Sequence, residues 1–153
     1  MVSPGKLNSR ILADRVAWIN RMLEEVGKLP LDDYEGFILD SRNIWTAESC
    51  LRRSLEALLD LGRHILAKGF GKGITEYKEI ARELKKEKVL DDVHAGLLEL
   101  LAGYRNRLVH FYHEIEIEEL YKICKDDLHD IQDVRDAFLA WVKVNPDLID
   151  KVM

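Results

Sequence analysis

Ionisable and hydrogen-bonding side chains are concentrated in one segment, Tyr104-Arg105-Asn106-Arg107-Leu108-Val109-His110-Phe111-Tyr112. Its two guanidiniums are planar forks of donors that match the geometry of a phosphate. The imidazole of His110 ionises near neutral pH and is suited to moving a proton. RNA cleavage without a metal ion needs both functions, because a base takes the ribose 2′-OH proton while cations stabilise the charge that develops on the phosphate. The residue types therefore predict phosphate binding joined to proton transfer.

Helical geometry limits how these groups can meet. On an uninterrupted helix Arg105 and His110 differ by about 140° in azimuth and lie on different faces, whereas Arg107 and His110 share a face. Either the helix ends or distorts before His110, or Arg105 acts with groups from elsewhere, such as a second subunit. A polar helix end with no catalytic role is the alternative interpretation.

Other groups of residues favour non-catalytic interpretations. The glycines at 69, 71 and 73 lack the preceding strand and the Gly-Lys-Ser/Thr ending of a phosphate loop, so they predict a helix end followed by a turn. His110 and His113, with Glu114 adjacent, could share a metal ion, but a third and a fourth ligand are not obvious; solvent-facing or hydrogen-bonded histidines are the favoured interpretation, and no metal site is predicted. The aspartates at 126, 127, 130 and 133 do not match a calcium loop and predict a solvated face.

Apolar residues recur at steps of three and four along most of the chain, which indicates helices. The pattern predicts helices over about 7–28, 41–68, 75–85, from Asp91 through Leu108, and from 116–119 to 144 with a possible break near 126–129. Thr75 is expected to cap the third of these, and Val93 to lie on the apolar face of the fourth. The fold class is all-α, an up-and-down bundle of four main helices plus a short accessory helix, in one domain over 1–153 with a core at about 8–144.

Length and composition bound the class of protein. The chain has 153 residues, 47% of them hydrophobic and 33% charged, with a net charge of −5. These values are typical of one globular domain and argue against a charge-driven DNA coat protein. No apolar run is long enough to cross a membrane, and two cysteines suit a reducing compartment, so a cytoplasmic protein is expected.

The segment from Arg105 to Tyr112 matches the Arg-x4-His-x-Tyr pattern of HEPN-domain toxins and resembles their HepT-like branch. Residues 58–65, 103–104 and 116–121 are also similar to that branch, and the order of elements agrees from about 8 to 140. The resemblance implies the HEPN fold and a homodimer whose two motifs face each other across a cleft. It also implies a metal-independent endoribonuclease that uses no cofactor, with Arg105 and His110 as the catalytic pair and Asn106 in support.

The resemblance further implies a type II toxin–antitoxin system. Its antitoxin would be a minimal nucleotidyltransferase (MNT) that adds AMP to Tyr112 and so places negative charge at the mouth of the site. Arg107 is a candidate for binding the RNA substrate. Two alternatives stay open: a non-catalytic HEPN partner that serves only as the AMPylation substrate, and a structural dimer with a polar helix end.

Two departures from the family pattern remove no motif residue, but the first, a longer connection, could alter access to the cleft. The connection over 27–40 is longer than expected, and Phe111 and His113 flank Tyr112. Arg52, Arg53, Arg63 and His64 could widen a positive rim, with exposed helix residues as the alternative interpretation.

Overall fold

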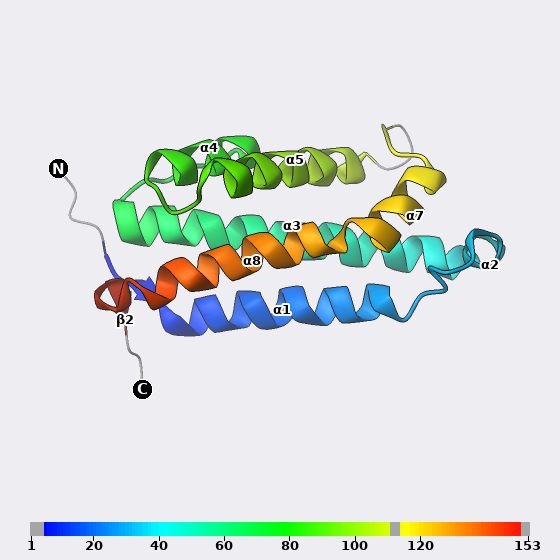
Figure 1. The fold of residues 1–153 in the computed structure, drawn as a ribbon, viewed down its shortest axis with the longest axis horizontal. Helices are drawn as coiled ribbons and strands as arrows, with labels where there is room; N and C mark the ends of the chain where they lie inside the picture. Colours follow the sequence, from blue (N-terminus) through cyan, green and yellow to red (C-terminus); the bar gives the residue numbers. More distant parts are fainter. Residues whose placement is uncertain (1–4, 111–113, 151–153) are drawn as a thin grey trace.

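Helices make up the fold that the computed structural model describes, over residues 5–110 and 114–150. The long helices are α1 (Ser9–Gly27), α3 (Ser41–Phe70), α5 (Asp92–Val109) and α8 (Leu128–Lys143), and the shorter ones are α2 (Tyr34–Leu39), α4 (Tyr77–Lys86) and α7 (Ile117–Asp126). Successive long helices run in opposite directions (Figure 1). The predicted all-α, up-and-down bundle of four main helices with an accessory α4 is confirmed.

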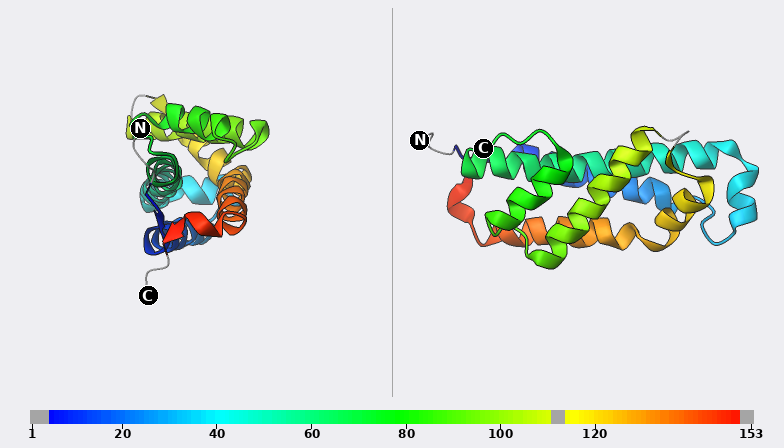
Figure 2. Two further views of the ribbon diagram at one scale, coloured as in Figure 1. Left: turned by 90° about the vertical axis from the view of Figure 1, so that its left-hand side faces the viewer. Right: turned by 90° about the horizontal axis from the view of Figure 1, so that it is seen from above.

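Helix α3 is the element around which the others are arranged. It contacts α1, α4, α5, α7 and α8, with α4 and α5 on one side, α1 on the opposite side and α8 along a flank between them (Figure 2). Its buried residues recur at helical spacing, among them Leu51, Leu55, Leu58 and Leu66, so one apolar face meets several neighbours. Burial of this apolar face stabilises the bundle. The same packing fixes the position of the polar residues of α3 relative to α5.

A close approach of three helices explains one glycine of α3. A Cβ added at Gly62 would lie 2.9 Å from Leu84 Cδ1 of α4 and 3.2 Å from Phe138 Cζ of α8. Because a methyl group does not fit there, the glycine lets α4 and α8 pack directly against the backbone of α3.

Helix ends follow local signals in the sequence. Gly71 ends α3 in the left-handed conformation, with φ of 67°, and its N–H donates to the Ala67 carbonyl, which confirms the predicted helix end at the glycine cluster. The Asp91 side chain accepts from the His94 N–H and caps α5. The predicted cap at Thr75 is wrong, because α4 begins at Tyr77 and its N-cap is Glu76, without a side-chain bond.

Several features of the chain depart from the predictions. The connection over 27–40 contains α2, which buries Phe37. By contrast, the possible break near 126–129 is confirmed, because α7 ends at Asp126 and α8 begins at Leu128. Val93 is 75% exposed rather than part of the apolar face. It lies two residues from the buried Ala95 and so about 200° around the helix from it.

The two ends of the described chain meet in a small element. Strand β1 (Leu7–Asn8) pairs in parallel with β2 (Ile149–Asp150), which follows the 3₁₀ turn η1 (Pro146–Leu148). None of the helices within 5–110 and 114–150 is long and apolar enough to cross a membrane.

Candidate active site

The motif lies where α5 ends. The helix stops at Val109, and His110 is its C-cap with φ of −109° and ψ of 43°. The N–H of His110 donates to the Arg107 carbonyl at 3.1 Å. Of the geometric alternatives that the sequence left open, the first is therefore confirmed: the helix ends before His110. The imidazole is exposed, and it forms no hydrogen bond or ion pair with any residue of the described chain.

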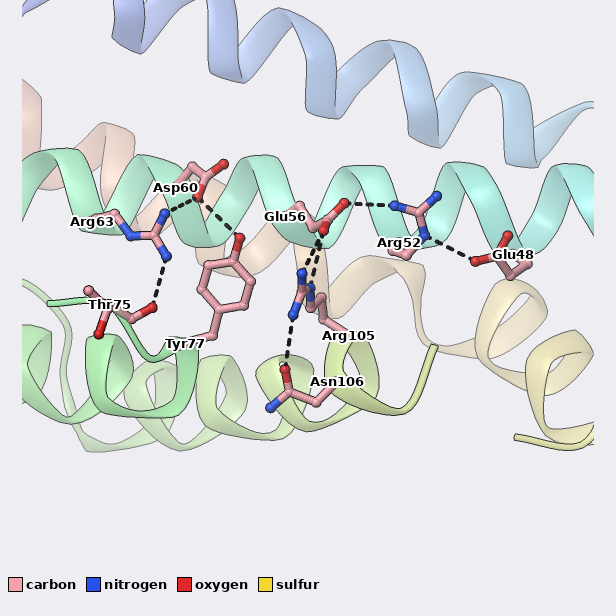
Figure 3. A network of polar contacts seen from close by, with 9 residues as sticks. All are labelled: Glu48, Arg52, Glu56, Asp60, Arg63, Thr75, Tyr77, Arg105 and Asn106. Carbon is pink, nitrogen blue, oxygen red and sulfur yellow. Dashed lines mark hydrogen bonds and ion pairs between the residues drawn. The ribbon is translucent and has the colours of Figure 1, made fainter. Parts of the chain in front are cut away.

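Arg105 is held on three sides by neighbouring groups (Figure 3). Its Nε and Nη2 donate to Glu56 Oε2 of α3 at 3.2 and 2.9 Å, and its Nη1 donates to Asn106 Oδ1 at 3.3 Å. The guanidinium carbon also lies 4.6 Å from the centre of the Tyr77 ring. With a side chain only 26% exposed, Arg105 has a defined position rather than a solvated one.

Glu56 belongs to a row of alternating charges along α3. Arg52 donates from Nη1 to Glu56 Oε1 at 3.0 Å and from Nε to Glu48 Oε1 at 3.0 Å. The three residues are four apart, so they lie on one helix face. Both oxygens of Glu56 thus accept from arginines, Oε1 from Arg52 and Oε2 from Arg105 (Figure 3).

Tyr77 is fixed by a second polar group one turn further along α3. Its hydroxyl lies 3.3 Å from Asp60 Oδ1, which also accepts from Arg63 Nη1 at 3.0 Å. Arg63 lies over the same ring at 4.9 Å and donates from Nη2 to the Thr75 carbonyl at 2.9 Å. Burial, followed by the charge of Asp60, raises the pKa of Tyr77, so the phenol is neutral at physiological pH.

A cavity of about 500 Å³ opens beside these groups. Its lining comes from α3, from α4 and the two residues before it, and from α5, and it consists of Arg63, Thr75, Glu76, Tyr77, Lys78, Arg105 and Asn106. Two of the predicted site residues, Arg105 and Asn106, therefore face one hollow. A larger hollow of about 780 Å³ lies at the turn between α4 and α5, and none of the predicted site residues lines it.

Arg107 is directed to a different set of partners. It forms a two-pronged ion pair with Glu119, with Nη1–Oε1 at 2.5 Å and Nη2–Oε2 at 2.6 Å, and it donates to the Glu114 carbonyl. The hydrogen bonding that Arg107 donates to Glu119 is the main cause that raises the pKa of Arg107. The guanidinium thus ties the chain beyond the motif back to α5, and these bonds use four of its five N–H groups, which leaves one for an RNA phosphate. Tyr112, the predicted AMPylation residue, lies outside the described residues, as does His113.

The expected positive rim is largely occupied by structural contacts. Arg52 and Arg63 are bound to acids and carbonyls as described above, and Arg53 donates to Ser49 Oγ at 3.0 Å. His64 Nε2 accepts the N–H of Asn8 at 3.0 Å, and burial is the main cause that lowers its pKa. Arg52 and Arg53 thus bind groups of α3 itself, while Arg63 and His64 bind backbone groups outside it, so these side chains already have partners within the chain.

One group of possible metal ligands occurs in the described chain. Side-chain atoms of His129, Asp130 and Asp133 lie within 4.8 Å of one another at the start of α8. The group lies on the surface and shares no residue with the cavity, so it has no connection with the motif.

Sequence reasoning missed Glu56 and Tyr77. Glu48, Arg52, Glu56 and Asp60 follow one another at steps of four, which marks a charged stripe on one helix face. That spacing could have identified the α3 side of the site. No local pattern indicates that Tyr77 lies over Arg105, because the contact joins residues 28 positions apart.

Comparisons with known proteins agree on one family. A family model described as Ribonuclease HepT-like matches residues 19–138. The chain is also 30% identical over 115 residues to a tRNA nuclease HepT from Aphanizomenon flos-aquae (strain 2012/KM1/D3), over 72% of this chain and 76% of that protein.

Solved structures show the same fold. A tri-AMPylated Shewanella oneidensis HEPN toxin in complex with MNT antitoxin is similar with a TM-score of 0.76 and 21% identity, over 85% of this chain and 97% of that one. YutE, a cytosolic protein of unknown function from Bacillus subtilis, is similar with a TM-score of 0.74 and 18% identity, over 95% and 98% of the two chains. The predicted HEPN fold is thereby confirmed.

Proposed function

Because this chain belongs to the family of HepT-like ribonucleases, we propose that it is the toxin of a type II toxin–antitoxin system and a metal-independent endoribonuclease. One observation carries the proposal: α5 ends at Val109, immediately before an exposed imidazole, while Arg105 is fixed at a cavity one turn earlier. A phosphate-binding group and a proton-transfer group thus occur together at the end of one helix.

The reaction that these groups suit is transfer of a phosphate within the RNA chain. The imidazole of His110 takes the proton of a ribose 2′-OH, and the 2′ oxygen attacks the adjacent phosphorus. The bond from phosphorus to the 5′ oxygen breaks, and that oxygen takes a proton from water as it leaves, while the imidazole returns its proton to the solvent. The products are a 2′,3′-cyclic phosphate and a 5′-hydroxyl end. Arg105 stabilises the charge that develops on the non-bridging oxygens, and Asn106 offers a further donor.

Two copies of the chain supply the site in this proposal. Within one copy, no hydrogen bond joins the His110 imidazole to Arg105 or Asn106 in the described chain, and the imidazole is exposed. A two-fold axis next to the end of α5 would bring a second His110 and a second Arg105 to the same cleft. A homodimer would thus bring together an imidazole and a guanidinium that are not hydrogen-bonded to each other within one copy.

The relatives suggest a substrate and an antitoxin to test first. One relative is named a tRNA nuclease, so tRNA is the first substrate class. A similar solved structure is an AMPylated HEPN toxin bound to an MNT antitoxin, and we propose that a cognate MNT adds AMP to Tyr112 here. That residue follows His110 by two positions, and an added phosphodiester would repel RNA phosphates from the site.

The decisive experiment compares wild type with His110→Ala and Arg105→Ala. Each is expressed without the cognate MNT antitoxin while growth and RNA integrity are recorded. The proposal expects growth arrest and RNA fragments with cyclic phosphate ends for wild type alone, and purified wild type should cut tRNA in excess EDTA. Undiminished cleavage by His110→Ala, or cleavage that needs a divalent ion, contradicts the mechanism.

A second candidate function is a non-catalytic HEPN partner that MNT modifies. The lack of any bond between the His110 imidazole and Arg105 in the described chain favours this alternative. It expects intact RNA in every expression strain and a mass increase of one AMP after incubation with MNT and ATP. The increase should be absent in Tyr112→Phe and present in His110→Ala.

A further inference from the structure

We propose that Glu56 and Tyr77 are positioning residues for Arg105, which they hold at the cavity for the phosphate of the RNA substrate. This inference rests on the proposed function and assigns roles to two residues outside the motif. Glu56 comes from α3 and Tyr77 from α4, so the guanidinium of α5 is fixed at the meeting point of three helices (Figure 3). A cation that is already in place needs no reorganisation when charge develops on a phosphate.

The carboxylate of Glu56 is itself held in one position by a second arginine. Its Oε1 accepts from Arg52 while its Oε2 accepts from Arg105, and Arg52 is bound in turn by Glu48. These ion pairs form a row of four alternating charges that sum to zero. The last charge in the row is the guanidinium of Arg105, which lies at the cavity. Such an arrangement supports the arginine without surrounding it with excess negative charge.

Tyr77 restricts the guanidinium from its flat side. The ring centre lies 4.6 Å from the guanidinium carbon of Arg105 and 4.9 Å from that of Arg63. Its hydroxyl lies at 3.3 Å from Asp60, and Arg63 binds the Thr75 carbonyl just before α4. The ring is therefore held at its hydroxyl end and at the start of its helix, and it is in turn a fixed surface for Arg105.

Arg105 retains donors for a ligand in this position. A guanidinium has five N–H groups, and the bonds to Glu56 and Asn106 use three of them. Two N–H groups remain, so a phosphate can bind without displacing Glu56. The two remaining N–H groups favour a positioning role for Glu56 over an inhibitory role, in which Glu56 would compete with RNA for Arg105.

The test measures kcat and KM for tRNA cleavage with Glu56→Gln, Tyr77→Phe and Tyr77→Leu. Glu99→Gln is a matched control, because Glu99 Oε1 accepts Nε and Nη2 of Arg82 at 3.2 and 2.8 Å, the same arrangement on the surface of α4 and α5. Positioning predicts that Glu56→Gln and Tyr77→Leu lower kcat by about 10-fold to 100-fold with a smaller change in KM. Tyr77→Phe keeps the ring but removes its bond to Asp60, so it should lower kcat less than Tyr77→Leu does. Only Glu99→Gln should stay within about threefold of wild type.

A second readout does not depend on activity. The Nε–H resonance of Arg105, assigned by its loss in Arg105→Lys, should be ordered in wild type and mobile in Glu56→Gln and Tyr77→Leu. Faster cleavage by Glu56→Gln, or kcat unchanged in both variants, overturns the proposal. A wild-type Arg105 resonance as mobile as in the variants overturns it too, whether or not RNA is cut. If wild type does not cut RNA but Arg105 is ordered through Glu56 and Tyr77, the proposed function fails while the positioning contacts stand.

Discussion

Alanine at Gly62 and at Gly96 should change the free energy of unfolding in different ways. Both glycines lie inside helices, α3 and α5, so both substitutions gain about 1 kcal/mol of helix propensity. At Gly96 the new methyl group meets nothing within 4 Å, whereas at Gly62 it would lie 2.9 Å from Leu84 Cδ1 and 3.2 Å from both Ile80 Cγ2 and Phe138 Cζ. The propensity gain cancels between the variants, and the difference between them measures overpacking alone.

Overpacking of a helix junction costs about 1–3 kcal/mol. Gly96→Ala should therefore raise Tm by about 2–4 °C, and Gly62→Ala should melt about 2–12 °C below it. Urea unfolding followed by circular dichroism measures both variants against wild type, with the slope of the transition as a check that the unfolded state is unchanged. Equal stability of the two alanine variants would refute the close approach of α4 and α8 to the backbone of α3.

Other predictions concern chemistry and pH. His110→Ala should lower tRNA cleavage by at least about 10²-fold to 10⁴-fold, with Tm unchanged because the imidazole is exposed and has no partner in the described chain; a quantitative cleavage assay and a melting curve check this. Burial raises the pKa of the Cys124 thiol to about 12, so iodoacetamide at pH 8 should leave Cys124 unmodified in the folded protein and alkylate it after unfolding in urea, as mass spectrometry would record. The hydrogen bond from the His94 N–H is the main cause that lowers the pKa of Asp91. The ionised Asp91 therefore stabilises the fold at pH values above the ordinary pKa of an aspartate, and this stabilisation is lost as the pH falls through the lowered pKa of the folded state. Asp91→Ala should consequently destabilise the protein at pH 7 and less so near pH 3, in paired urea titrations, and equal destabilisation at both pH values would contradict it.

Local patterns in the sequence predicted the parts of the fold that local forces determine. The periodicity of α3 and the glycines at its end predicted a helix over about 41–68, and the helix ends two residues later, at Phe70. Asp91 correctly predicted the start of α5. The segment around Phe37 was missed because its six-residue helix is stabilised by tertiary contacts, including the ring of Tyr121 at 5.1 Å. The prediction that Val93 lies on the apolar face of α5 was wrong, because a single apolar residue near the start of a helix does not determine which side of the helix is buried.

The candidate site was predictable only in part for a similar reason. Arg105, Asn106 and His110 are close in sequence and have residue types suited to phosphate chemistry. Glu56 lies 49 positions from Arg105, so no local pattern could pair them, although the steps of four along α3 mark the face on which Glu56 lies. Whether Arg105 and His110 of different copies meet depends on an interface that one chain does not contain.

The end of α5 has a consequence for amide hydrogen exchange. Arg105 lies inside a helix that packs on α3, so its amide should exchange only when much of the bundle opens. The His110 amide is on the exposed C-cap and donates to a carbonyl three residues back, so it should exchange through local fraying. Two residues of one short motif would thus differ greatly in protection, and slower exchange at His110 would report the docking of a second copy or of RNA.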